Sequence, residues 1–187
     1  MGASYTSELA AALASDVLRR FDRYVRVDTQ SARERTQSPS TAGQLDLGRL
    51  LVAELTEAGI ADAELDRDGY VTGTLPGNVG NGRAIGLIAH MDTSPDAPGA
   101  GVEPIVHADY DGGVIELPRS GTRLDPAAMP ELAAKRGHDI VTASGDTLLG
   151  ADDKAGVAEI MTFVRLLMSD RSIPHPRIRV GLSLIHI

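Results

Sequence analysis

Apolar residues recur at helical spacing in three segments of the chain. The first segment runs from about residue 7 to residue 25. The second is marked by a group of leucines between residues 47 and 55, and Gly59 is placed to end it in a left-handed conformation. The third, residues 157–168, has the clearest apolar stripe and is followed by Pro174. The pattern therefore predicts three amphipathic helices.

Strand-like patterns lie between and after these helices. Residues 63–65 and 70–75 flank Asp68-Gly69, a dipeptide that favours a tight hairpin. The unbroken apolar run 84–89 predicts a central strand buried on both faces. Residues 177–180 alternate polar and apolar, as an entering strand does.

The segment from residue 94 to residue 145 is rich in Gly, Pro and Asp and predicts loops and short strands. Helices that alternate with strands are typical of an α/β fold, here with a mostly parallel mixed sheet flanked by helices. The length of 187 residues favours one domain.

Composition and charge exclude several classes of protein. The chain has 26 acidic and 18 basic residues, for a formal net charge of −8, so nucleic acid is not an expected partner. Cysteine is absent, and any bound metal must therefore be held by His and carboxylates. No apolar run is long enough to cross a membrane and no signal sequence is apparent, so we expect a cytoplasmic protein without a membrane partner.

The first candidate chemistry lies where the apolar strand ends, at His90-Met91-Asp92. Ligand sites in open α/β sheets usually form at the carboxyl ends of strands. Side chains two residues apart share a face, so Asp92 can lie beside His90 and fix its tautomer. The alternative is a surface histidine next to a turn-forming aspartate, and the triplet alone does not decide between the two.

The second candidate is the pair Asp152-Asp153, which stands after a Gly turn at the start of the third predicted helix. Either carboxylate could cap the helix. One cap does not require two aspartates, however, and a carboxylate can bridge two metal ions. One of the pair could cap while the other ligates. Lys154, one of only two lysines in the chain, follows directly.

Together these motifs resemble the peptidase T family, dizinc aminopeptidases that remove the N-terminal residue of tripeptides. The resemblance extends from about residue 21 to residue 180. The tracts that carry it are Tyr24 to Ser31, Pro39 to Thr41, His90 to Asp96, Thr147 to Met161 and Ile173 to His175.

The resemblance implies a role for three residues. His90 would ligate one zinc, Asp152 would bridge two zinc ions, and Asp92 would be the catalytic-site carboxylate that orients His90. It also implies tripeptide substrates and the possibility of a homodimer in the full-length protein. The remaining histidines of the predicted fold match no ligand position, and we expect them to be exposed or in loops: His107, His138 and His175.

The pattern departs from the family at residues 182–187. In the family this strand runs into an aromatic residue and Thr-Pro-Asp-Glu-Glu, which supplies a general base and a ligand of the other zinc. Here His186 and Ile187 stand at the positions of the two glutamates, and His186 is a poor ligand candidate. The resemblance therefore implies that residues 1–187 are the N-terminal part of a catalytic domain, incomplete at its C-terminus and without the inserted lid or dimerisation domain. We therefore expect that the reading frame is interrupted near residue 182 and that the chain has little or no peptidase activity.

Three other interpretations stay open. Asp92-Thr93-Ser94 resembles the active-site turn of aspartic proteases, although that chemistry needs a second such carboxylate in a β-rich fold. An aminoacylase-like amidohydrolase is a nearer alternative. A non-catalytic binding or regulatory fragment is the third.

Overall fold

The computed structural model describes residues 5–34, 36–80 and 82–185 of the chain. Three long helices are present, α1 (Glu8–Val25), α2 (Ala42–Glu57) and α4 (Ala151–Ser169), as the apolar spacing predicts. Local signals set their ends: Ser7 Oγ accepts the Ala10 N–H at 3.0 Å, and Gly59, with φ of 95°, follows α2.

Four strands form the main sheet in the order β1-β2-β8-β3. Strands β1 (Glu64–Leu65) and β2 (Val71–Leu75) form the predicted hairpin, β8 (Ile178–Ser183) pairs antiparallel with β2, and β3 (Ile85–His90) pairs parallel with β8. The mixed α/β architecture is confirmed. One of the three pairings in the described sheet is parallel, a smaller share than the pattern of alternating helices predicts.

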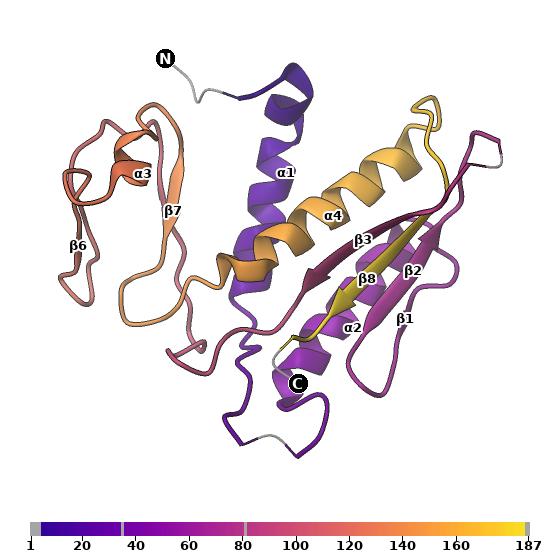
Figure 1. Cartoon of the computed structure of the whole chain (residues 1–187), viewed down its shortest axis with the longest axis horizontal. Helices are drawn as coiled ribbons and strands as arrows, with labels where there is room; N and C mark the ends of the chain where they lie inside the picture. The colour runs from indigo at the N-terminus through magenta and orange to yellow at the C-terminus, as the bar shows by residue number, and fades with distance from the viewer. Residues whose placement is uncertain (1–4, 35, 81, 186–187) are drawn as a thin grey trace.

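The helices lie on one side of this sheet, as Figure 1 shows. Helix α4 contacts β3, α2 contacts β1 and β2, and α1 packs on α4. Val180 and Leu182 point into this core, whereas Ile88 on the opposite face has 76% of its surface exposed. The prediction that residues 84–89 are buried on both faces is therefore wrong. A strand is buried on both faces only where a layer of structure covers each face of the sheet, and in the described part of the chain only one face is covered. In addition, β3 lies at the edge of the described sheet and not at its centre.

Residues 94–145 form a smaller lobe of loops and short strands, on the far side of α1 from the main sheet in the view of Figure 1, as the Gly- and Pro-rich composition predicts. Its strands pair as two separate antiparallel ladders, and a short helix, α3, was not apparent from the sequence. The elements are β4 (Ile105–His107), β5 (Ile115–Glu116), β6 (Arg123–Leu124), α3 (Pro130–Ala133) and β7 (Ile140–Thr142). Strand β4 pairs with β7 and β5 with β6. Over the described residues, no helix combines the length and the apolar character that crossing a membrane requires.

Candidate metal centre

The fold brings His90 and Asp152 together although 62 positions separate them. His90 is the last residue of β3, and Asp152 lies at the start of α4, which packs against that strand. His90 Nε2 lies 2.9 Å from Asp152 Oδ1. On the other side of the ring, His90 Nδ1 lies 2.9 Å from the backbone carbonyl oxygen of Asp92.

These contacts limit the protonation of the imidazole. A carbonyl oxygen only accepts, so Nδ1 carries the hydrogen and donates to Asp92. In the neutral ring Nε2 is then an acceptor, and it faces a carboxylate oxygen, which is also an acceptor. A proton or a metal ion has to lie between the two atoms. Two ligands of one tetrahedral zinc, each about 2.0 Å from it, lie roughly 3.3 Å apart, so the two atoms, 2.9 Å apart here, would have to separate slightly to hold the metal.

The structure separates the roles of the two adjacent aspartates. Asp153 Oδ1 accepts the Gly156 N–H at 3.1 Å and so caps the first regular turn of α4. The side chain of Asp152 is 95% exposed apart from its contact with His90. Both residues have non-helical backbone angles, and the peptide bond between them is cis. Asp152 is therefore the carboxylate available to a metal.

Asp92 is fully buried and held from two sides. Ser31 Oγ donates to Asp92 Oδ2 at 3.0 Å, and the Ile185 N–H donates to Asp92 Oδ1 at 2.9 Å. The carboxylate lies 3.4 Å from His90 Nδ1, farther than the carbonyl of the same residue. Asp92 lies beside His90 as the strand alternation predicts, and Met91 between them is fully buried. The carbonyl of Asp92, more than its carboxylate, orients the ring.

The residues that support Asp92 could not be recognised from the sequence pattern. Gln44 donates from Nε2 to Ser31 Oγ at 3.0 Å, and its side-chain oxygen accepts the Ser40 N–H at the start of α2. Thr29 Oγ1 donates to the Met91 carbonyl at 2.7 Å. Thr29 and Ser31 do lie in one of the tracts that carry the peptidase T resemblance, and that was the available signal.

Lys154 is buried and ties the start of α4 to the segment after α1. Its Nζ donates to the Val27 carbonyl at 2.8 Å, and 1% of the residue is exposed. Burial lowers the pKa of Lys154 to about 8, and the nearby carboxylates of Asp28 and Asp92 oppose that shift. The lysine thus anchors the loop that carries Asp152.

The other histidines do not join the centre in the described part of the chain. His107 contacts Thr142 Oγ1 at 3.0 Å, and His138 is partly buried in the small lobe. His175 lies in a loop as expected, but it is buried, with 4% exposed. His186 lies outside the described residues. Among described residues, no group of three or more His, Asp or Glu side chains surrounds one point.

A hollow of about 350 Å³ opens beside the centre. Its wall includes the last residue of β3, Ile185 two residues beyond β8, and residues on both sides of the start of α4, so it lies at the carboxyl end of the parallel strand pair. The residues that line it are His90, Ser94, Leu148, Gly150, Ala151, Asp152 and Ile185. A ligand in this hollow would contact both candidate metal ligands.

Three solved peptidase structures share the fold of this chain. The chain superposes on aminopeptidase PepT from Bacillus cereus with a TM-score of 0.61 at 22% identity, covering 91% of this chain and 36% of that one. A tripeptidase from Staphylococcus aureus gives 0.59 at 20% identity, covering 91% and 36%. Aminoacylhistidine dipeptidase from Vibrio alginolyticus gives 0.57 at 21%, covering 97% and 30%. The chain therefore has the fold that these peptidases share.

Curated relatives are more similar in sequence than these solved structures are. The chain is 47% identical to peptidase T of Aliivibrio fischeri over 169 residues, which is 90% of this chain and 41% of that protein. It is 46% identical to peptidase T of Geobacillus thermodenitrificans over 170 residues, again 90% and 41%. No family model matches the chain. The resemblance to peptidase T is confirmed, and the chain spans about 41% of the length of these relatives.

Proposed function

We propose that this chain is part of the catalytic domain of a metal-dependent aminopeptidase that releases the N-terminal residue of tripeptides. The observation that carries the proposal is the pair His90 Nε2 and Asp152 Oδ1, 2.9 Å apart at the end of β3. The 47% identity to peptidase T supports the reaction class. The N-terminal position of the chain within that domain, the lid domain, a homodimer and the cytoplasmic location stay predictions.

Zinc suits the two donors. An imidazole nitrogen and a carboxylate oxygen are ordinary zinc ligands, and the hydrogen bond from Nδ1 to the Asp92 carbonyl leaves the Nε2 lone pair for a metal. Asp152 has its second oxygen exposed, which is the arrangement a carboxylate needs to bridge a second ion. Bound zinc would polarise the scissile carbonyl and acidify a water molecule. The count of two zinc ions belongs to the proposal.

The protein groups have separate tasks in this proposal. His90 and Asp152 hold the metal, and Asp92 positions His90 through its carbonyl. Ser31 and the Ile185 N–H keep Asp92 from turning, because each donates to one of its carboxylate oxygens. The hollow beside the centre has space for the end of a short peptide. Two described protein ligands are fewer than the three that a catalytic zinc usually keeps, so this chain should bind zinc weakly and hydrolyse little peptide.

Zinc titration of the purified 187-residue chain tests the metal ligands. Calorimetry should detect one weak site in the wild type, and His90→Ala or Asp152→Asn should weaken it at least about tenfold, since even outer-sphere changes cost that much. His138→Ala is the matched control, because His138 lies in the small lobe and should leave zinc binding unchanged. Equal zinc affinity in the wild type and His90→Ala would falsify the assignment.

Peptide hydrolysis tests the reaction class. With added zinc, the chain should release little or no N-terminal residue from a tripeptide. Robust zinc-dependent release would contradict the two-ligand argument, and preference for N-acyl amino acids over tripeptides would instead favour an aminoacylase-like amidohydrolase. A trace of zinc-dependent release that His90→Ala abolishes would favour the aminopeptidase, whereas zinc binding with no release above that of His90→Ala would favour a binding or regulatory fragment.

A further inference from the structure

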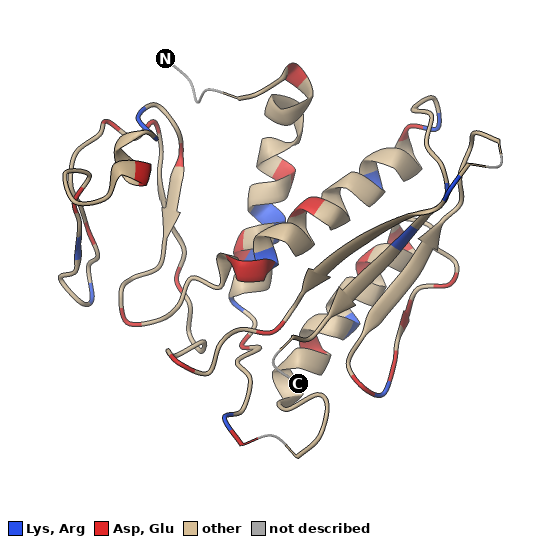
Figure 2. Ribbon diagram, viewed as in Figure 1, with Lys and Arg blue, Asp and Glu red and all other residues tan. Residues whose placement is uncertain are grey.

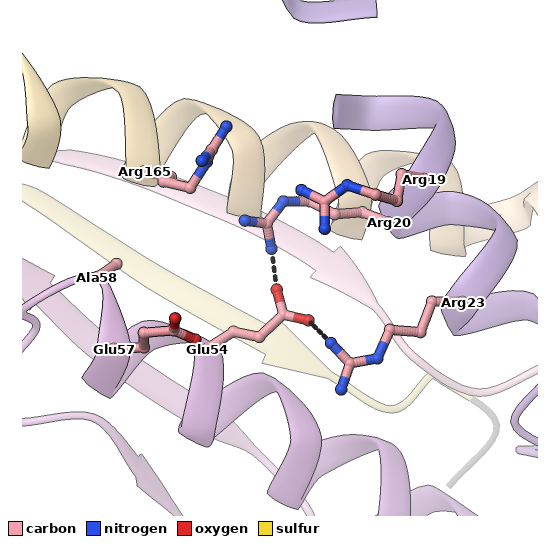
Figure 3. A pocket seen from close by; sticks show the side chains of 7 residues that line it. All are labelled: Arg19, Arg20, Arg23, Glu54, Glu57, Ala58 and Arg165. Carbon is pink, nitrogen blue, oxygen red and sulfur yellow. Dashed lines mark hydrogen bonds and ion pairs between the residues drawn. The ribbon is translucent and has the colours of Figure 1, made fainter. Parts of the chain in front are cut away.

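A second polar hollow lies where α1, α2 and α4 meet, and it shares no lining residue with the candidate metal centre. Its volume is about 360 Å³. Figure 2 shows basic positions of α1 gathered where that helix passes α4. The residues that line the hollow, drawn in Figure 3, are Arg19, Arg20, Arg23, Glu54, Glu57, Ala58 and Arg165. Four guanidinium groups against two carboxylates leave an excess of two positive charges in a chain of net charge −8.

The inner wall of the hollow is a buried polar framework. The side chains of Arg20 and Glu54 are only 10% and 12% exposed, and they form an ion pair. The Tyr24 hydroxyl, fully buried, donates to Glu54 Oε2 at 2.8 Å and accepts from Arg20 Nη1 at 3.2 Å. Burial raises the pKa of Tyr24 to about 12, so the hydroxyl keeps its proton at neutral pH. These contacts hold the Arg20 guanidinium in place.

The carboxylate of Asp16 holds three of the four guanidinium groups in place. It is buried and pairs with Arg19, with Arg20 and with Arg165, whose Nη2 lies 3.0 Å from Asp16 Oδ2. With Asp16 included, the cluster keeps one positive charge in excess. Figure 3 shows the guanidinium groups of Arg19, Arg20 and Arg165 near one another, and Glu57 on the other side of the hollow.

These arginines keep N–H donors that the protein does not use. A guanidinium has five N–H donors. Among the described residues, Arg19 makes one side-chain hydrogen bond, through Nη2, and Arg165 makes one through Nε with an ion-pair contact from Nη2. The side chains of Arg19 and Arg165 are 69% and 53% exposed, so their remaining donors are open to a ligand.

We propose that this hollow binds a tetrahedral oxyanion of the phosphate class, either free or at the end of a small metabolite. Donors from α1 and α4 approach from different directions, and four oxygens arranged as a tetrahedron can accept from several of them, whereas a carboxylate offers two oxygens in one plane. Glu57, without a hydrogen-bond or ion-pair partner among the described residues, can accept the hydroxyl hydrogen of a phosphate monoanion. The proposal does not depend on the metal centre.

Phosphorus NMR of inorganic phosphate with the metal-free 187-residue chain tests the site. Ionic strength is held constant with sodium chloride, because general screening would otherwise imitate binding. We expect saturable binding by the wild type and about tenfold weaker binding by Arg19→Gln, the usual effect of losing a hydrogen bond to a charged group. Arg165→Gln is the second variant, should Arg19→Gln fail to fold by circular dichroism.

Arg26→Gln is the matched control. Arg26 also lies at the end of α1, is half exposed and pairs with one aspartate, Asp22 at 2.8 Å, but it does not line the hollow. It should bind phosphate as the wild type does, and so should His90→Ala, which separates this site from the metal centre. Competition by sulfate supports a tetrahedral oxyanion, and tighter binding of glycerol phosphate than of phosphate identifies an ester as the source. Absence of saturable binding, equal loss in Arg26→Gln, or acetate binding as tightly as phosphate would overturn the proposal.

Discussion

Asp16 is a buried carboxylate surrounded by three guanidinium groups. Burial by itself raises the pKa of Asp16, but the charges of Arg20 and Arg165 outweigh it, and the pKa lies below its ordinary value. A depressed pKa in the folded state means that the ionised carboxylate stabilises the fold. That stabilisation is complete above the unfolded pKa of about 3.9 and is lost as the pH falls through the lower folded value.

Asp16→Asn should therefore lower the free energy of unfolding at pH 7 by about 1–3 kcal/mol, because the variant keeps the shape but loses charge-assisted hydrogen bonds. Urea denaturation at pH 7 and at steps below pH 4 measures it, and the difference from wild type should narrow on the acid side. Asp22→Asn is the control, since the exposed Asp22–Arg26 pair is screened by water and should contribute much less than Asp16. A cost for Asp16→Asn that does not change with pH would contradict the argument.

At the scale of single residues, the sequence indicated which side chains could form a candidate site but not which residues hold them in place. His90, Asp92 and Asp152 carry side chains that suit a metal centre, and residue type is local information. The sequence left open which of the paired aspartates caps α4, and the hydrogen bond from Gly156 to Asp153 decides it. The role of Ser31 was missed because a serine in a sequence does not show which group its hydroxyl contacts. Only the structure places Ser31 Oγ 3.0 Å from the Asp92 carboxylate.

Helix α2 is placed by a close approach to the segment that carries Ser31. A Cβ at Gly43 would lie 1.7 Å from the backbone oxygen of Asp28. A Cβ at Gly48, five residues further along the same helix, would meet the end of the Leu65 side chain, at 2.8 Å. A side chain can rotate away, whereas the backbone of Asp28 cannot move without shifting Ser31.

Gly43→Ala should accordingly destabilise the chain by about 3 kcal/mol, the upper part of the usual range for overpacking. Gly48→Ala should lower the free energy of unfolding by less. Alanine is more favourable than glycine in a helix by about 1 kcal/mol, and this gain offsets part of the unfavourable energy of the contact with Leu65. Chemical denaturation of both variants gives the comparison. Equal free energies of unfolding for the two would show that the Asp28 backbone yields more easily than the contact indicates.

Among the elements, periodicity predicted the three long helices and the hairpin within a few residues. The segment 94–145 was assigned correctly to loops and short strands, but α3 was missed, since four residues are too few to show a helical period. Beyond the hairpin, the sequence pattern did not predict which strands pair with one another. Pairing of β3 with β8 depends on residues about 90 positions apart.

For the whole molecule, the described sheet has one buried and one open face. Leu182 is fully buried under the helices, and Ile88 on the neighbouring strand is 76% exposed on the opposite face. An open apolar position on an edge strand contributes little to stability and favours association between chains.

Leu182→Ala should therefore lower the free energy of unfolding by about 2–5 kcal/mol, while Ile88→Ala should change it by no more than about 0.5 kcal/mol. Thermal or urea unfolding of the two variants measures this difference between the faces. A large loss of stability in Ile88→Ala would mean that the second face is covered in solution. If another copy of the chain covers it, the loss of stability should depend on protein concentration; if a segment of the same chain covers it, the loss should not.

The sequence alone determined the helices, the hairpin, the donor types of the candidate centre and the resemblance to peptidase T. Each of these follows from short-range order: the period of apolar residues, the turn dipeptide, the identity of side chains in a motif. The tertiary structure decided which face of β3 is buried, which aspartate remains exposed, and that four arginines from two helices line one hollow. Burial and proximity depend on which distant segments pack together, and no local pattern records that.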